Sequence, residues 1–207
     1  RALMNQLGTP ASRRNVMVSL ERIGKLERSE GNLSLAREHF GAYLALAREN
    51  LKTLPTPANH RSVSLALSRF GDLERTDGNL APARTYYKEA LSIARELADQ
   101  LETPESRQDV ASAVLALGDL DRQEGKLIAA RVHFREHLEI VRALAEQLGT
   151  PASQQNVMAS ISRIGNLEQA EGNLPVARGH FEEYLALARN QAEKLPTPAS
   201  RRSVSLA

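Results

Sequence analysis

Residues 9–55 read TPASRRNVMVSLERIGKLERSEGNLSLAREHFGAYLALARENLKTLP, and the chain repeats this stretch with a period of 47 residues. Thr-Pro steps mark the period and end at Pro10, Pro57, Pro104, Pro151 and Pro198. Glycines recur in two columns at the same spacing, which are Gly24, Gly71, Gly118 and Gly165, and Gly31, Gly78, Gly125 and Gly172. A period of about 20 to 50 residues indicates a solenoid, in which each unit buries its apolar face against its neighbours.

The first half of each unit is predicted to be a helix, here named helix A. Thr9 is a suitable N-cap, and Pro10 suits the first helical position, where a missing N–H costs nothing. Apolar residues then follow at steps of three and four, the spacing of one buried helical face. These residues are Val16, Leu20, Ile23 and Leu26. Gly31 is expected to end the helix, because glycine readily takes the left-handed conformation.

A second helix, helix B, is predicted after Asn32. Its apolar stripe also steps by three and four. The stripe consists of Ala36, Phe40, Leu44, Ala47, Leu51 and Leu54. Pro55 closes the helix because proline cannot continue one. Each unit is therefore predicted to be an αα-hairpin of two helices, each roughly 30 Å long.

The predicted fold class is all-α, an α/α superhelical solenoid of antiparallel helix hairpins that spans 1–207 as one domain. Its full repeats are 9–55, 56–102, 103–149 and 150–196, and 1–8 and 197–207 are partial repeats. Neither end carries a polar capping helix, so we expect the ends to expose apolar residues, including Val204 and Leu206. Such surfaces find partners, and self-association through the ends is therefore expected.

Gly24 and its equivalents fall inside helix A, where glycine costs about 1 kcal/mol relative to alanine. We expect a close approach of the two helices to offset this cost, with aromatic residues of helix B filling the adjacent space. These aromatic residues are Phe40, Tyr87, Phe134 and Phe181. A ligand that touches the glycine backbone is the alternative.

The ordered set Leu20, Gly24, Gly31, Ala36, Phe40 and Leu44, matched in the other three units, resembles the tetratricopeptide repeat (TPR) family. That family has a usual unit of about 34 residues, with an aromatic residue near the start of helix A that is absent here. The resemblance implies a right-handed superhelix whose concave groove, lined mainly by helix A, binds peptides or partner proteins.

The face of helix A away from its apolar stripe supplies the candidate groove residues. They are Arg14, Val18, Glu21, Lys25 and Arg28 in the first unit, Arg61, Leu65, Ser68, Asp72 and Arg75 in the second, Ser112, Leu115, Asp119 and Arg122 in the third, and Asn166 in the fourth. Columns of arginine make the N-terminal half cationic, which suits an acidic partner through bidentate pairing with carboxylates. A solvated helix face with local ion pairs, such as Glu21 with Lys25, is the alternative.

Histidines supply the single hint of a metal. His133 and His137 are four residues apart, and His180 occupies the column of His133. Two ligands at this spacing can share a metal. His39 and Tyr86 fill the same column, however, so packing at the helix B surface is the simpler interpretation and no metal or cofactor is predicted.

Composition and motifs favour a binding protein over an enzyme. The chain has no cysteine and a net charge of +2, and it lacks an apolar run of membrane-spanning length. No nucleophile, base and orienting residue recur together. We therefore predict a protein- or peptide-binding scaffold from a bacterial cytoplasm, the bacterial origin following from the excess of arginine over lysine. A sensor array that controls an attached effector domain is the alternative. Nucleic-acid binding is disfavoured because aromatic stacking platforms are missing.

Overall fold

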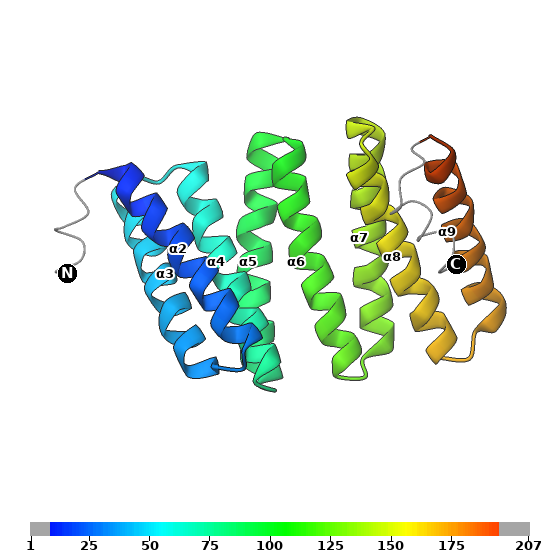
Figure 1. Cartoon of the computed structure of the whole chain (residues 1–207), viewed down its shortest axis with the longest axis horizontal. Coiled ribbons are helices and arrows are strands. Elements are labelled where there is room, and N and C mark those ends of the chain that lie inside the picture. The colour runs from blue at the N-terminus through cyan, green and yellow to red at the C-terminus, as the bar shows by residue number, and fades with distance from the viewer. Residues whose placement is uncertain (1–8, 195–207) are drawn as a thin grey trace. The chain divides into compact units, whose positions relative to one another are not determined.

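The computed structural model describes residues 9–194, which form eight helices joined by short loops (Figure 1). The helices are α2 (Pro10–Ser29), α3 (Leu33–Thr53), α4 (Pro57–Thr76), α5 (Leu80–Leu101), α6 (Pro104–Gln123), α7 (Leu127–Leu148), α8 (Pro151–Ala170) and α9 (Leu174–Lys194). They alternate as helices A and B of the predicted hairpins, so the all-α prediction is confirmed. None of these helices combines the length and apolar character that a membrane span requires. Val204 and Leu206, for which exposure was expected, lie outside the described residues, as do residues 1–8.

Each A helix starts at the predicted Thr-Pro signal. The Thr9 side chain accepts a hydrogen bond from the Ser12 backbone N–H at 3.2 Å, and Pro10 is the first residue of α2. This side-chain bond satisfies one of the N–H groups that the first turn leaves without a helical partner. The same cap starts the other A helices, at Thr56, Thr103 and Thr150.

The glycine after each A helix takes the expected left-handed conformation. Gly31 has a φ of 83°, and its N–H donates to the Arg28 carbonyl at 3.2 Å. The N–H of Asn32 reaches back to the Glu27 carbonyl at 2.9 Å. These two bonds form a Schellman motif, which ends the helix and turns the chain into helix B.

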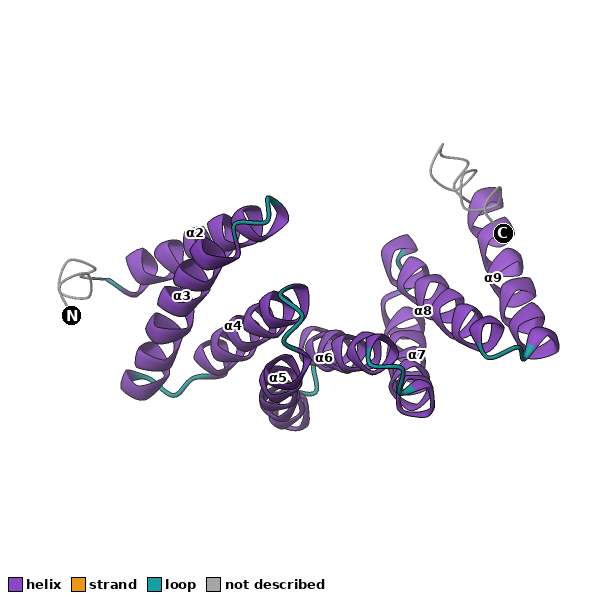
Figure 2. Cartoon of the chain, turned by 90° about the horizontal axis from the view of Figure 1, so that it is seen from below, coloured by secondary structure: helices purple, strands orange, loops and turns teal. Residues whose placement is uncertain are grey.

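The chain forms two compact units, 1–106 and 107–207. In the first unit, α2 to α5 pack in chain order, each antiparallel to the next (Figures 1 and 2). Its core includes Phe40, Leu67 and Leu73. In the second unit α7, α8 and α9 follow the same arrangement, and α6 covers Phe134 of α7. Each unit is thus a stack of helix hairpins around its own apolar core.

The predicted apolar stripe of helix B is buried along most of its length. Ala36, Phe40 and Ala47 are fully buried, and Leu44 is 8% exposed. Leu54 departs from the prediction and is 57% exposed, because α3 ends at Thr53 and Leu54 already has an extended backbone.

The stripe of helix A is exposed at its C-terminal end in the first hairpin, whereas Val16 and Leu20 are half-buried against the core. Ile23 and Leu26 of α2 are 42% and 56% exposed, contrary to the prediction. The matching residues of α4, Phe70 and Leu73, are 8% and 0% exposed. Phe70 packs edge-on against Phe40 of the preceding helix B, with ring centroids 6.4 Å apart. These two positions therefore need a preceding hairpin to bury them.

The glycines inside helix A lie against the aromatic rings of helix B, as predicted. A Cβ atom placed on Gly24 would lie 2.5 Å from Cε1 of Phe40, and one on Gly165 would lie 2.7 Å from Cε1 of Phe181. Phe40 is fully buried and cannot swing away at low cost. Every side chain larger than hydrogen would therefore push the ring and separate the two helices.

Replacing Gly71 by Ala is expected to destabilise the protein by about 1–3 kcal/mol, because the new methyl group would overlap the ring of buried Tyr87. The matched control is Gly179→Ala in α9, where the new Cβ meets no atom within 4 Å. That change should stabilise the helix by up to about 1 kcal/mol. Thermal melts of both variants measure the difference, and melting temperatures that rise together would contradict the close crossing.

Within each unit, an arginine of helix B joins its hairpin to two acids at the C-terminal end of the following helix A. In the first unit Arg37 of α3 donates to Glu74 of α4 and, at 3.0 Å, to Asp77. Glu74 is 4% exposed and also accepts a bond from Asn79 at 2.9 Å. Burial alone would raise the pKa of Glu74, but the bonds from Arg37 and Asn79 outweigh it and hold the pKa below its ordinary value.

The second unit repeats this contact between α7 and α8. Arg131 Nε donates to Glu168 at 2.7 Å, and its Nη2 donates to Glu171. Glu168 is 3% exposed, and the bond from Arg131 lowers its pKa. Apolar side chains flank the pair, since Ile164 and Leu167 are each 1% exposed. The arginine and the acids thus lie at the edge of the apolar contact between the two hairpins.

Arg131→Ala should destabilise the second unit by roughly 3 kcal/mol, because it leaves the Glu168 carboxylate buried without its cation. Arg142→Ala is the control, since the Arg142–Glu183 pair spans α7 and α9 on the surface, with side chains 46% and 40% exposed. Exposed pairs contribute about 0–1 kcal/mol. Urea unfolding of both variants tests this, and equal losses of stability would show that burial of Glu168 is unimportant.

Candidate protein-interaction surface

Helices α2 and α4 carry the ten candidate groove residues of the first unit. None of the ten is buried, as a binding role requires. Four are exposed, namely Arg14, Val18, Lys25 and Arg61, and six are half-buried, namely Glu21, Arg28, Leu65, Ser68, Asp72 and Arg75. Leu65 is partly buried against the core, so the apolar part of this surface is contiguous with the core.

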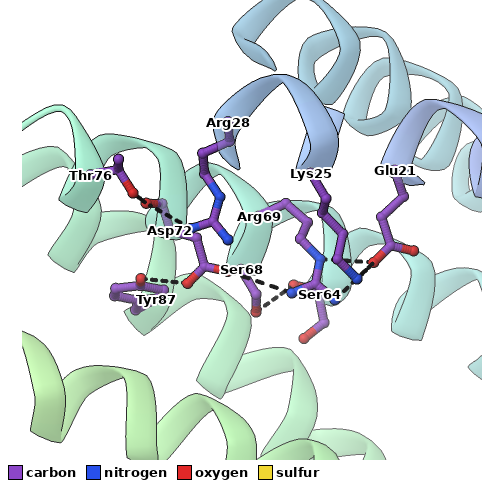
Figure 3. A network of polar contacts seen from close by, with 9 residues as sticks. All are labelled: Glu21, Lys25, Arg28, Ser64, Ser68, Arg69, Asp72, Thr76 and Tyr87. Carbon is purple, nitrogen blue, oxygen red and sulfur yellow. Dashed lines mark hydrogen bonds and ion pairs between the residues drawn. The ribbon is translucent and has the colours of Figure 1, made fainter. Parts of the chain in front are cut away.

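A polar network joins the two A helices of this unit (Figure 3). Arg69 of α4 donates from Nε to Glu21 of α2 at 2.8 Å. Its Nη1 lies 3.5 Å from Oδ2 of Asp72, one turn along α4. Arg69 therefore pairs with two carboxylates of the candidate surface, and its single positive charge offsets one of the two negative charges.

Asp72 is also tied to the hairpin core. The hydroxyl of Tyr87 donates to Oδ1 of Asp72 at 2.8 Å (Figure 3). Burial and the negative charge of Asp72 raise the pKa of Tyr87, so this phenol stays protonated and keeps donating. The same ring packs against Gly71, which couples the surface carboxylate to the close crossing of α4 and α5.

Some cations of this surface lie beside a carboxylate, and others do not. Lys25 lies 3.5 Å from Glu21, so the local ion pair expected for the solvated alternative is present. Arg28 instead donates to the backbone carbonyl of Asp72 at 3.4 Å. A carbonyl carries no net charge, so this bond orients the Arg28 guanidinium without neutralising it.

The second unit presents a less basic surface from α6 and α8. Ser112, Arg122 and Asn166 are exposed, and Leu115 and Asp119 are half-buried. Oδ1 of Asp119 lies 3.8 Å from Nε of Arg163 on α8. Leu115 packs partly against the core of its unit, as Leu65 does in the first unit.

The histidines hold separate protein partners. His133 Nδ1 lies 2.7 Å from Oδ2 of Asp121, and His137 Nδ1 lies 3.0 Å from Oγ of Ser160 on α8. His137 is 5% exposed, and burial, together with the charge of Arg163, lowers its pKa to about 4. Within 9–194 no three His, Cys, Asp or Glu side chains gather as metal ligands would. Each histidine thus has its own partner within the protein, and His137 lies deeper than the helix surface.

Two residues organise this surface in ways that the sequence analysis did not predict: Arg69, which was not singled out, and Tyr87, which was expected only as a ring against the glycine of helix A. Arginine recurs in its repeat column, at Arg22 and Arg163, but Arg69 is 48 residues from Glu21 and nothing local in the sequence pairs the two. Tyr87 replaces a phenylalanine of the first hairpin, and this substitution was the one available signal that its hydroxyl has a partner.

No protein-family model matches the sequence, and no curated protein matches it either. Solved structures do match. BtubC (BKLC) from P. vanneervenii aligns with a TM-score of 0.66 at 18% identity, over 88% of this chain and 66% of that protein. The chain thus spans slightly less than two thirds of BtubC. The yeast histone chaperone Hif1, described as a scaffold that recruits protein complexes to core histones, aligns with a TM-score of 0.54 at 15% identity, over 94% of both chains. The chain shares their helical fold. At these identities the likeness extends to the fold alone.

Stability is expected to fall between pH 7 and pH 5 because of His137. Its pKa is about 4 in the folded protein and about 6.5 in the unfolded chain. Unfolded chains therefore bind the proton first as the pH drops below 6.5, and about 2 kcal/mol of stability is lost by pH 5.

Urea unfolding of the wild type and of His137→Gln at both pH values measures this loss. The Gln variant cannot titrate at this position, so its stability should fall by about 2 kcal/mol less over the same interval. Equal losses in the two proteins would show that His137 does not remain neutral in the fold.

Proposed function

We propose that this chain is a TPR-type scaffold that binds a protein or peptide partner along its A helices. The four repeats form one solenoid in this proposal, and their A helices line its groove. Support comes from the hairpin fold, the close crossings at the glycine column and the finding that every candidate residue in both units is exposed or half-buried. Helix hairpin repeats present such surfaces on a rigid frame, so little backbone conformational freedom is lost on binding.

The partner we propose is acidic, and it contacts α2 and α4. Both carboxylates among the candidate residues of these helices, Glu21 and Asp72, already have cationic or hydroxyl partners within the protein. Arg28 donates to a backbone carbonyl, and its charge remains available to a ligand. Arg14 and Arg61 are exposed at the same position of successive repeats. Guanidinium groups suit bidentate recognition of carboxylates.

The basic surface of the first unit is the observation that favours a binding function over a purely structural spacer. Candidate residues of the second unit include one acid, Asp119, and one arginine, Arg122. We therefore place the main contact with an acidic partner on α2 and α4. The half-buried leucines, Leu65 and Leu115, offer apolar contacts beside the polar ones.

Selection of random peptides displayed on phage tests this proposal without knowledge of the natural partner. Peptides that bind the chain should be enriched in Asp and Glu, and their affinity should fall as salt rises. The double variant Arg14→Ala and Arg61→Ala should weaken a selected acidic peptide by about tenfold in a fluorescence anisotropy titration and flatten the salt dependence.

Arg48→Ala with Arg95→Ala is the matched control, because these two arginines are exposed on the B helices α3 and α5 of the same unit. This control removes the same charge and should leave the affinity within about twofold. Peptides without acidic residues, or equal losses in the two double variants, would contradict an acidic partner on α2 and α4.

A further inference from the structure

The arginines of the candidate surface on α2 and α4 form two rows that cross both helices. Arg14 and Arg61 make the N-terminal row, and Arg28 and Arg75 make the C-terminal row. The two arginines of each helix are 14 residues apart. This distance is about four helical turns, so both side chains leave the same face of their helix. At a rise of about 1.5 Å per residue, the two rows lie about 21 Å apart.

The C-terminal row carries positive charge that the described chain does not neutralise. Arg28 donates to the backbone carbonyl of Asp72 at 3.4 Å, and the hydroxyl of Thr76 donates to the same carbonyl at 2.8 Å (Figure 3). Nε of Arg75 is buried without a hydrogen-bond partner. Both arginines are half-buried, and neither forms an ion pair with a carboxylate of 9–194. The row is therefore held in place by the fold and keeps its charge.

The surface between the two rows is electrically balanced. Glu21 lies midway, seven residues from each arginine of α2. Its Oε1 accepts a hydrogen bond from Arg69 at 2.8 Å and lies 3.5 Å from Nζ of Lys25 (Figure 3). Asp72 lies 3.5 Å from Arg69 in turn. The two acids and two cations cancel, so an acidic group of a ligand gains little at the centre of this surface.

Salt makes the two rows act independently. The Debye length at physiological ionic strength is about 8 Å, well short of the separation of the rows. A single carboxylate of a ligand therefore interacts with one row at a time. A ligand that carries a carboxylate for each row gains from the linkage of the two contacts, because the second contact becomes intramolecular.

We propose that this surface selects an extended peptide segment with acidic residues at two points about 21 Å apart and none between them. The inference rests on the proposed function and gives the acidic partner a sequence pattern. An extended chain advances about 3.3 Å per residue, so this separation corresponds to acidic residues about six positions apart. Side chains at that spacing lie on the same side of the extended backbone. Glu21 is the specificity residue, because it already occupies Arg69 and repels a third acid at the centre.

Synthetic peptides of equal length and composition test the spacing. Each carries two pairs of adjacent glutamates among neutral polar residues, with the centres of the pairs two, six or twelve positions apart. In fluorescence anisotropy titrations at physiological ionic strength, the peptide with the six-position spacing should bind about tenfold more tightly than the other two.

A variant of the C-terminal row tests whether both rows take part. Arg28→Gln removes the charge and keeps an amide donor. It should weaken the six-position peptide to the level of the two-position peptide, which can bind at either row and should lose at most about twofold. Lys88→Gln is the control, because it removes the same charge at an exposed position of α5 in the same unit. This control should leave the order of the three affinities unchanged.

A third glutamate between the two pairs tests the role of Glu21. With the wild type this addition should change the affinity by at most about twofold. With Glu21→Gln it should strengthen binding at least about threefold, because Arg69 and Lys25 then lack their internal carboxylate. Glutamine has nearly the shape of glutamate, and circular dichroism melts check that every variant is folded.

The possible failures are distinguishable. If acidic peptides of every spacing fail to bind, the proposed function is wrong and this inference is wrong with it. Equal affinities at the three spacings would overturn the inference alone, because binding would then follow total charge. An equal gain from the third glutamate in the wild type and in Glu21→Gln would overturn the specificity assigned to Glu21.

Discussion

The contact between a glycine of helix A and an aromatic ring of helix B is the constraint on which this structure depends. Without a side chain at Gly24 the Phe40 ring lies directly on the backbone of α2, and the same holds in the later hairpins. Each glycine costs about 1 kcal/mol of helix propensity. That cost is offset because the crossing buries a whole ring and sets the distance at which the two helices pack.

The loop after each A helix links the hairpin to its neighbour. Glu74 accepts hydrogen bonds from the Asn79 side chain in this loop and from Arg37 of the preceding helix B. The same carboxylate therefore stabilises both the turn and the packing of the two hairpins. Because Glu74 is buried, its carboxylate is stable only with both donors in place. The contact is therefore directional, since helix B supplies the cation and the following helix A supplies the acids.

Charged side chains on the A helices serve two purposes. Arg69, Glu21 and Asp72 hold α2 and α4 together, and with Lys25 beside Glu21 their charges cancel. Arg14 and Arg28 contribute charge that no carboxylate in the described chain compensates at ion-pair distance. A binding function draws on the second group, because ion pairs already satisfied within the protein have little to gain from a ligand. The basic character of the surface thus depends on which residues the fold has already paired.

Sequence by itself determined the helices, their ends and the glycine crossings. Thr9, Gly31 and Phe40 act through neighbours within one hairpin, and the period of 47 residues repeats that local pattern. Only the tertiary structure decided which distant charges form pairs, such as Arg69 with Glu21. It also decided that Ile23 is exposed, whereas Ile164 at the same repeat position is buried. The physical reason is that ion pairing and burial depend on the adjacent hairpin. Repeat positions with equivalent sequence differ when that neighbour differs.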